Sequence, residues 1–318
     1  HKEYRRQRQM CIRDRTIIGG TGSDFIAGGS GNDEITGGAG SDILNGGAGN
    51  DTFIYQAAAD FYTGTAVNDA VDGQGGTGDA IRFDSTNGSG ITIPSTVVLD
   101  NVQNVEKITV VASANPYSFT FIAASPTTSS FSTIDLSGDI NATGINVVSS
   151  TGLDGISTII GSTGVDQITL GTGVPATTIT GGAGVDALSI TAPESTVTIT
   201  DLGNGYDTLT TATSGTTNAT LYLNASSAVN YIPASGAIGA STTAILTVGA
   251  AASGTVNLSG MTANAGMLTL TASTATGGLT LIGTGGSETI IGGAGGDTIT
   301  GGAGGDSITG GAGIDKFI

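Results

Sequence analysis

Four aspartates recur every nine residues near the start of this 318-residue chain, and each has the same neighbours. Residues 19–54 read GGTGSDFIA, GGSGNDEIT, GGAGSDILN and GGAGNDTFI, which fits G-G-x-G-x-D-x-U-x, where U is a large apolar residue. Carboxylate oxygens are the ligands that a hard divalent cation prefers, so this spacing indicates cation binding. The aspartates are Asp24, Asp33, Asp42 and Asp51, and the U residues are Ile26, Ile35, Leu44 and Phe53.

A second array of the same type closes the chain at residues 283–318, reading GTGGSETII, GGAGGDTIT, GGAGGDSIT and GGAGIDKFI. In its first unit a glutamate replaces the aspartate and the glycines are displaced. The acidic residues are Glu288, Asp297, Asp306 and Asp315.

Short turns and strands must position these carboxylates. Glycines at the first, second and fourth places allow positive φ and a tight turn. The last three residues, x-U-x, are expected to form a short strand with one side chain facing inward. The aspartate then lies where the turn becomes a strand, and its carboxylate points back over the turn.

The nonapeptide resembles the repeats-in-toxin (RTX, haemolysin-type) family of secreted proteins. The resemblance implies an all-β fold, a parallel β-roll or β-solenoid in which two nonapeptides make one coil. Repeats n and n+2 would then stack about 4.8 Å apart, with Asp24 over Asp42 and Asp33 over Asp51. Calcium is the implied cofactor, held by the carboxylates and by carbonyl groups of the glycine loops. The loop glycines are Gly20, Gly22, Gly29, Gly31, Gly38, Gly40, Gly47, Gly49, Gly293, Gly295, Gly302 and Gly304.

Stacked carboxylates repel each other, by about 1 kcal/mol per pair in water and roughly 3 kcal/mol at an effective dielectric constant of about 20. Calcium, which takes about 6–8 oxygen ligands, turns the repulsion between the carboxylates into a net attraction to the shared ion. We therefore expect the arrays to fold on binding calcium. The longer side chain of Glu288 predicts weaker binding at Glu288–Asp306 than at Asp297–Asp315. A flexible Gly/Asp linker is the alternative, but it gives no reason for an apolar residue at the eighth place of every nine.

The charge of the chain is divided unevenly. Six of its nine basic residues lie in segment 1–15, and from Thr16 onward 3 basic and 24 acidic residues give a net charge of −21. Such a surface repels nucleic acid and anionic lipid and attracts cations. Segment 1–15 contains no glycine and is predicted to be extraneous or disordered. The chain has no apolar run of about 18 residues, which predicts no membrane span.

Catalytic signatures are scarce. The one histidine and the one cysteine, His1 and Cys11, both lie in segment 1–15, so neither a Ser-His-Asp triad nor a His-ligated zinc site is expected. Paired aspartates can hydrolyse glycosides, but those of the arrays are better explained as metal ligands. We therefore predict that the chain is not an enzyme.

Between the arrays the pattern is degenerate. Residues 56–117 contain GDAIRF, with Asp79 and Ile81 in repeat-like places, and a strand-like stretch at 101–110. Residues 118–282 are Thr-, Ser- and Ala-rich short strands, which fit a β-solenoid or a β-sandwich. Three remnants of the repeat favour one continuous solenoid, because their acidic residues follow one another at steps of 20 and 21 residues. They are the predicted metal ligands Asp166, Asp186 and Asp207.

The predicted divisions are therefore 1–15, the first array at 16–55, connecting strands at 56–117, a solenoid at 118–282 and the second array at 283–318. The chain ends inside a repeat, which indicates a fragment. The central stretch also resembles RTX-type surface-layer and "β-strand repeat" proteins. We expect a calcium-binding structural segment of a secreted bacterial surface protein, of surface-layer or adhesin type, exported by type I secretion.

The alternative is the non-catalytic carboxyl-terminal module of a secreted enzyme or toxin whose active domain lies elsewhere. The expected partners are calcium ions and either further copies of the chain, through self-assembly, or a cell-surface glycan. Neither nucleic-acid binding nor a membrane span is expected. The expected location is extracellular or at the bacterial cell surface.

Overall fold

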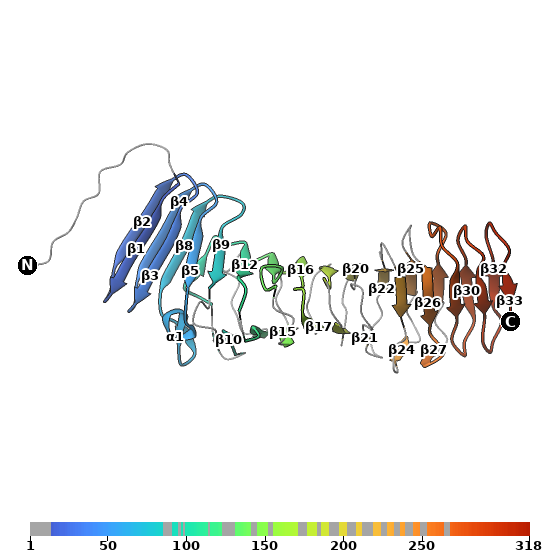
Figure 1. Ribbon diagram of the computed structural model, residues 1–318. Coiled ribbons are helices and arrows are strands. Elements are labelled where there is room, and N and C mark those ends of the chain that lie inside the picture. Colours follow the sequence, from blue (N-terminus) through green and yellow to red (C-terminus); the bar gives the residue numbers. More distant parts are fainter. Residues whose placement is uncertain are drawn as a thin grey trace, which may run out of the picture.

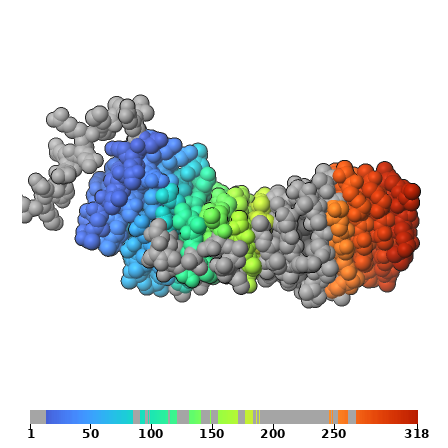
Figure 2. Space-filling model, viewed as in Figure 1, coloured from blue at the N-terminus to red at the C-terminus, as the bar shows by residue number. Residues whose placement is uncertain are grey.

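The computed structural model consists almost wholly of parallel strands that follow one another along a single axis (Figure 1). The blue N-terminal and red C-terminal parts lie at opposite ends of the molecule (Figure 2). The structure describes residues 14–84, 91–94, 97, 99–113, 115–122, 131–140, 145–151, 155–170, 177–182, 186–190, 197–201, 208–211, 219–223, 228–231, 236–238, 244–248, 253–263 and 268–318.

One nine-stranded sheet runs through the first two thirds of the chain, in the order β1-β3-β5-β9-β12-β14-β16-β18-β20. Its strands are β1 (Thr16–Thr21), β3 (Glu34–Ala39), β5 (Thr52–Tyr55), β9 (Ala80–Phe83), β12 (Lys107–Val110), β14 (Thr133–Asp135), β16 (Thr158–Ile160), β18 (Thr177–Thr180) and β20 (Val197–Asp201).

The strands between these form two further sheets, β11-β8-β4-β2 and β10-β13-β15-β17-β19-β21. Their bounds are β2 (Phe25–Ser30), β4 (Ile43–Ala48), β8 (Ala70–Gly75), β10 (Thr92–Ile93), β11 (Val102–Gln103), β13 (Ser118–Ile122), β15 (Ile145–Thr151), β17 (Val165–Leu170), β19 (Ala187–Ile190) and β21 (Thr208–Thr211).

The last third repeats the arrangement in sheets β22-β25-β28-β30-β32 and β23-β26-β29-β31-β33, with the pair β24-β27. The strands are β22 (Ala219–Leu223), β23 (Ala228–Tyr231), β24 (Gly236–Ile238), β25 (Ala244–Val248), β26 (Ser253–Asn257), β27 (Met261–Ala263), β28 (Leu268–Thr271), β29 (Leu279–Ile282), β30 (Glu288–Ile291), β31 (Thr298–Thr300), β32 (Ser307–Thr309) and β33 (Lys316–Phe317).

All neighbouring strands in these sheets are parallel, and each pairs with a strand one coil further along. This topology is that of a parallel β-roll or solenoid, and it excludes the antiparallel sandwich that the sequence left open. In the first array Ile17 pairs with Ile35 and Ile26 with Leu44, which confirms the predicted stacking of repeats n and n+2.

The apolar side chains of the eighth place fill the interior as predicted, except at the C-terminal end, where Ile308 is half-buried and Phe317 is exposed. Ile35, Phe53, Ile290 and Ile299 are fully buried. Because each coil places one such side chain on each sheet, the core is a column that continues from coil to coil through Ile81, Ile134 and Ile159.

Strand length differs from the prediction. The sequence predicted three-residue strands, and β31 and β32 have that length. In the first array β1 to β4 each span six residues and continue through the first three residues of the next nonapeptide. The prediction was wrong there because extended backbone carries the pairing through the two glycines, with Gly20 opposite Gly38 and Gly29 opposite Gly47.

An insertion interrupts the coils after β5. It contains α1 (Ala58–Phe61) and the antiparallel pair β6 (Tyr62–Thr63) and β7 (Ala66–Val67). Phe61 enters the core, with its ring centroid 4.8 Å from that of Tyr55 and 5.2 Å from that of Phe83. Within the described ranges, the structure contains no helix with the length and apolar character needed to cross a membrane.

Candidate metal centres

The predicted aspartates of the first array stand in two columns, one on each edge of the coil stack, where the loop turns into a strand. On the first edge the backbone N–H of Asp24 donates to Oδ1 of Asp42 (2.8 Å), and that of Asp42 donates to Asp69 (2.8 Å). The pairing of Asp24 with Asp42 is therefore confirmed.

On the second edge the N–H of Asp33 donates to Oδ1 of Asp51 (2.7 Å), as the sequence predicted for this pair. The column continues beyond the array, because Asp51 donates to Asp79 (2.6 Å) and Asp79 to Oε2 of Glu106 (2.9 Å).

These aspartates have a structural role that sequence reasoning missed. Oδ1 of Asp42 and Oδ1 of Asp51 each accept the backbone N–H of the aspartate one coil earlier, and Oδ1 of Asp33 accepts that of Arg15, which satisfies a donor between the strands. The sequence also missed Asp69 and Glu106 as members of the columns. The signal was present in D-A-V at 69–71 and E-K-I at 106–108, where an acidic residue again stands two places before an apolar strand residue.

The second oxygen of these aspartates has a different environment. In Asp24, Asp33, Asp42, Asp51 and Asp79, Oδ2 is buried and makes no hydrogen bond. A buried polar atom that is left unsatisfied costs about 1–3 kcal/mol, and more when it is charged. An unpaired carboxylate oxygen, repeated coil after coil, indicates a missing cationic partner.

A carbonyl group faces Oδ2 in Asp24, Asp33 and Asp79. A Cβ atom on Gly28 would lie 2.7 Å from Oδ2 of Asp33 and would overlap the carbonyl oxygen of Gly46, one coil further on. Gly19 has the same surroundings, with Oδ2 of Asp24 at 2.8 Å and the carbonyl of Gly37. The first-place glycine therefore leaves a space into which a carboxylate and a carbonyl oxygen converge.

These donors fit calcium, which binds carboxylate and backbone carbonyl oxygens. Among the described residues no three His, Cys, Asp or Glu side chains converge in one group, so backbone carbonyls would have to complete any coordination shell. The first-place carbonyls of Gly37 and Gly46 were not predicted as ligands. For the second- and fourth-place glycines a role as carbonyl ligands stays a prediction.

The second- and fourth-place glycines of the first array all have positive φ, as predicted, whereas the first-place glycines do not. A Cβ on Gly38 would also overlap the carbonyl of Gly20, so both the positive φ and this overlap exclude a side chain at Gly38. The values are 126° (Gly20), 103° (Gly22), 105° (Gly29), 108° (Gly31), 102° (Gly38), 140° (Gly40), 114° (Gly47) and 126° (Gly49).

The second array differs at its first two loops. Gly302 and Gly304 have positive φ, but Gly293 and Gly295 do not. Instead, the N–H of Gly293 donates to Oδ2 of Asp297 (2.8 Å), and the N–H of Thr284 donates to Oε2 of Glu288 (3.1 Å). We call these two loops, 283–288 and 292–297, self-capped, because their own backbone satisfies the carboxylate.

The stacking of the second array is nevertheless the predicted one. Glu288 donates its N–H to Oδ1 of Asp306 (3.0 Å), and Asp297 donates to Asp315 (2.9 Å). The weaker calcium binding predicted for Glu288–Asp306 stays a prediction.

The central remnants also stack. Asp166 donates its N–H to Oδ1 of Asp186 (3.0 Å) across the predicted step of 20 residues. Asp166 lies in a self-capped loop, because Ser162 donates its N–H to Oδ2 of Asp166 (2.7 Å). Asp207 lies outside the described residues.

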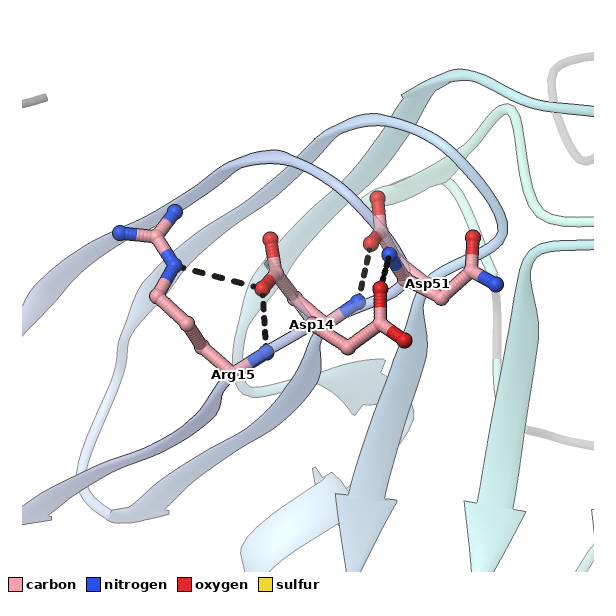
Figure 3. Close-up of polar contacts among 5 residues, drawn as sticks. Asp14, Arg15 and Asp51 are labelled. Atoms are coloured by element: carbon pink, nitrogen blue, oxygen red, sulfur yellow. Dashed lines mark hydrogen bonds and ion pairs between the residues drawn. The ribbon is translucent and has the colours of Figure 1, made fainter. Parts of the chain in front are cut away.

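Segment 1–15 contributes two described residues, which contact the first array. Both N and Nε of Arg15 approach Oδ1 of Asp33, at 2.9 and 3.3 Å, and Asp14 accepts the N–H of Asn32 at 2.8 Å (Figure 3).

Burial raises the pKa of three carboxyl groups in the columns. For Asp51 the neighbouring charge of Asp33 adds to the effect of burial. The pKa of Asp69 rises to about 6, first through burial and then through Asp42 and Asp60. That of Asp79 also rises to about 6, through burial and then through Asp51, Glu106 and Asp72. The stacked charges oppose one another in the absence of a cation.

The comparison with protein families points to the same residues. The chain matches the family described as "RTX calcium-binding nonapeptide repeat (4 copies)" at residues 18–53 and 282–317. No curated protein matches the chain. The matched residues hold the predicted acidic residues of the two arrays, their glycine loops and the stacked strands that place them, whereas Asp166, Asp186 and Asp207 lie outside the match. The two terminal arrays of this all-β chain therefore match the RTX calcium-binding nonapeptide repeat.

Proposed function

We propose that the chain is a calcium-binding structural segment of a secreted bacterial surface protein, of surface-layer or adhesin type. One observation carries the calcium part of this proposal. The buried, unpaired Oδ2 atoms of Asp33, Asp42 and Asp51 stand in loops whose first-place glycine leaves room for a ligand.

The residues of the chain would act as follows. The Oδ1 atoms fix the loops to the preceding coil, and the Oδ2 atoms with first-place carbonyls would hold the ion. Calcium would supply the positive charge that stacked carboxylates lack. Because a net charge of −21 from Thr16 onward opposes compaction, ordering of the coils is coupled to calcium.

The extracellular role is supported by the same coupling, because a fold that depends on calcium suits a compartment rich in that ion. The repeating parallel coils supply length and stiffness, which is what a surface stalk or lattice subunit requires. Self-assembly or binding to a cell-surface glycan are the partner classes that this role implies.

A second candidate is the non-catalytic carboxyl-terminal module of a secreted enzyme or toxin. The match to RTX repeats favours it equally, since such repeats form non-catalytic structural modules. An H-E-x-x-H or G-x-S-x-G motif upstream in the full reading frame would favour this candidate over the surface protein.

The test is a calcium titration of the full chain followed by far-UV circular dichroism, with magnesium as the control ion. We expect a cooperative gain of β signal with calcium and none with magnesium at equal concentration. The variant Asp42→Asn should shift the transition to higher calcium concentration, because Asp42 loses a charged ligand. A spectrum that is already complete in chelator and insensitive to calcium would overturn the calcium-coupled fold.

A further inference from the structure

The loop that ends at Asp79 lies outside the residues matched by the repeat family. It reads G-Q-G-G-T-G-D from Gly73, one residue longer than the G-G-x-G-x-D of the arrays. The strand pairing places the extra residue late in the loop, because Gly47 is opposite Gln74 before it and Thr52 is opposite Ala80 after it.

The Asp79 carboxylate nevertheless has the environment of the array aspartates. The side chain is fully buried, and its Oδ1 accepts the N–H of Asp51 at 2.6 Å. Its Oδ2 is buried without a hydrogen-bond partner, as in Asp33 and Asp51. The longer loop has therefore kept the carboxylate in register.

The space in front of this carboxylate is also kept. A Cβ on Gly73 would lie 2.6 Å from Oδ2 of Asp79 and would overlap the carbonyl oxygen of Asn104, which comes from the next coil. A Cβ on Gly76 would lie 2.9 and 3.0 Å from the two Asp79 oxygens and would overlap the carbonyl of Gly49, from the coil before. Oxygen atoms from three successive coils thus converge on one loop.

The backbone around this loop is held in a costly conformation. Among the described residues, Gln74 (φ 65°) and Asn104 (φ 51°) are the non-glycine residues with positive φ, and both lie here. Asp72 fixes both, accepting the N–H of Gln74 at 3.0 Å and Nδ2 of Asn104 at 2.8 Å. The arrangement presents the Asn104 carbonyl to Asp79 where a glycine does so in the arrays.

The counterpart on the opposite edge is closed. Asp69 is the third aspartate of the Asp24–Asp42 column, and the hydroxyl of Tyr55 donates to its Oδ2 at 2.9 Å. A phenol therefore satisfies the oxygen that is left unpaired in Asp79. The two edges have acidic columns of similar length, but they differ in which oxygens are available.

We propose that Asp79, with the carbonyl oxygens of Asn104 and Gly49, forms an additional calcium site beyond the family-matched repeats. The site extends the Asp33–Asp51 edge by one coil, whereas Tyr55 ends the Asp24–Asp42 edge. Asp51 and Glu106, on either side of Asp79 in the column, add negative charge that favours a divalent cation. The inference rests on the proposed function, because it assumes that the array sites bind calcium.

The test counts the calcium ions bound by the full chain, by equilibrium dialysis with elemental analysis, in wild type and three variants. In Asp79→Asn the amide oxygen can still accept the Asp51 N–H, so the backbone contact is preserved while the charge is removed. We expect Asp79→Asn to bind one ion fewer than wild type. The matched control Asp69→Asn, on the closed edge, should bind as many ions as wild type.

The variant Asp42→Asn separates the two proposals. If wild type binds calcium and Asp42→Asn loses an ion while Asp79→Asn does not, the additional site is overturned and the proposed function stands. If wild type binds no calcium, the proposed function itself fails.

A measurement on the wild-type chain covers the outcome that Asp79→Asn fails to fold. Crystals grown with terbium should show an anomalous peak in contact with the Asp79 carboxylate. Peaks at Asp33 and Asp51 without one at Asp79 would overturn the additional site.

Discussion

The two terminal arrays share one nonapeptide pattern but have two kinds of loop. In the first array the second-place glycines have positive φ, and Oδ2 of each array aspartate lacks a donor. In loops 283–288 and 292–297 the second-place N–H bonds to the carboxylate instead. The pattern therefore places the carboxylate, and the backbone angle at the second place decides whether that carboxylate needs a cation.

The second-place residue accounts for one of the two self-capped loops. Thr284 is β-branched, which disfavours positive φ. Gly293 could adopt positive φ but does not, and a Cβ there would meet the backbone of Ala272 and Ala275. Where the stack returns to glycine loops, Gly302 and Gly311 again have positive φ. Within the second array, the self-capped loops are those nearest the central coils.

Removal of calcium should produce the largest difference between the two arrays, in their protection from hydrogen exchange. We expect hydrogen exchange in chelator to rise at least about tenfold over residues 19–55, because that array has lost the partner of its buried charges. Residues 279–300 should keep most of their protection, since their carboxylates bond to backbone donors. Exchange measured by mass spectrometry with and without calcium gives both values. Equal loss of protection in the two regions would contradict the distinction.

Matched amide substitutions should have opposite signs in calcium-free protein. Asp51→Asn keeps the bond to the N–H of Asp33 and removes a buried repulsive charge, so the calcium-free fold should gain roughly 1 kcal/mol. Asp297 accepts from both Leu279 and Gly293, so Asp297→Asn brings two donors together and should cost about 1–3 kcal/mol. Urea unfolding in chelator measures both. Two changes of the same sign would count against self-capping.

The variant Thr284→Gly should convert one loop to the other kind. A glycine permits positive φ at the second place, which would release the N–H from Glu288 and leave that carboxylate available. We expect a gain in calcium affinity at this loop, with a loss of about 1 kcal/mol of stability in chelator. Thr284→Ser, which keeps the hydroxyl, is the control. A glycine variant with unchanged affinity in calorimetry would show that the second place does not govern binding.

The smallest expected effect is on pH dependence. The raised pKa of Asp79, about 6 against an ordinary 3.8, means that the calcium-free fold keeps a proton that the unfolded chain releases. Its contribution to stability is present below about pH 4 and is lost as the pH rises to about 6. The thermal midpoint in chelator should therefore fall over this window, and Asp79→Asn should reduce the fall. A midpoint that rises over the same window would contradict this account.

Much of this fold could be predicted from the spacing together with the resemblance to RTX repeats. A carboxylate every nine residues, in the two-nonapeptide coil that this resemblance implies, predicted the pairing of Asp24 with Asp42 and of Asp33 with Asp51. The 20-residue step between Asp166 and Asp186 was equally informative, since a lengthened loop does not disturb stacking.

The hydrogen bonds of the individual oxygens could not be predicted. The sequence does not show that Oδ1 binds the previous coil, since this depends on how the peptide plane lies at the loop's end. Nor does it show that Tyr55 reaches Asp69, because an insertion of unpredicted shape, α1 with β6 and β7, separates them.

Within each acidic column, the hydrogen bonds that join successive coils all run in one direction. In each pair the earlier coil donates an N–H and the later coil supplies the carboxylate, from Asp24 to Asp42 and from Asp297 to Asp315. The acidic columns therefore have a polarity along the stack. A coil added before a folded C-terminal neighbour can donate its backbone N–H to a carboxylate that is already in place. A coil added at the C-terminal end supplies a carboxylate, but its own acidic-residue N–H has no carboxylate to bond.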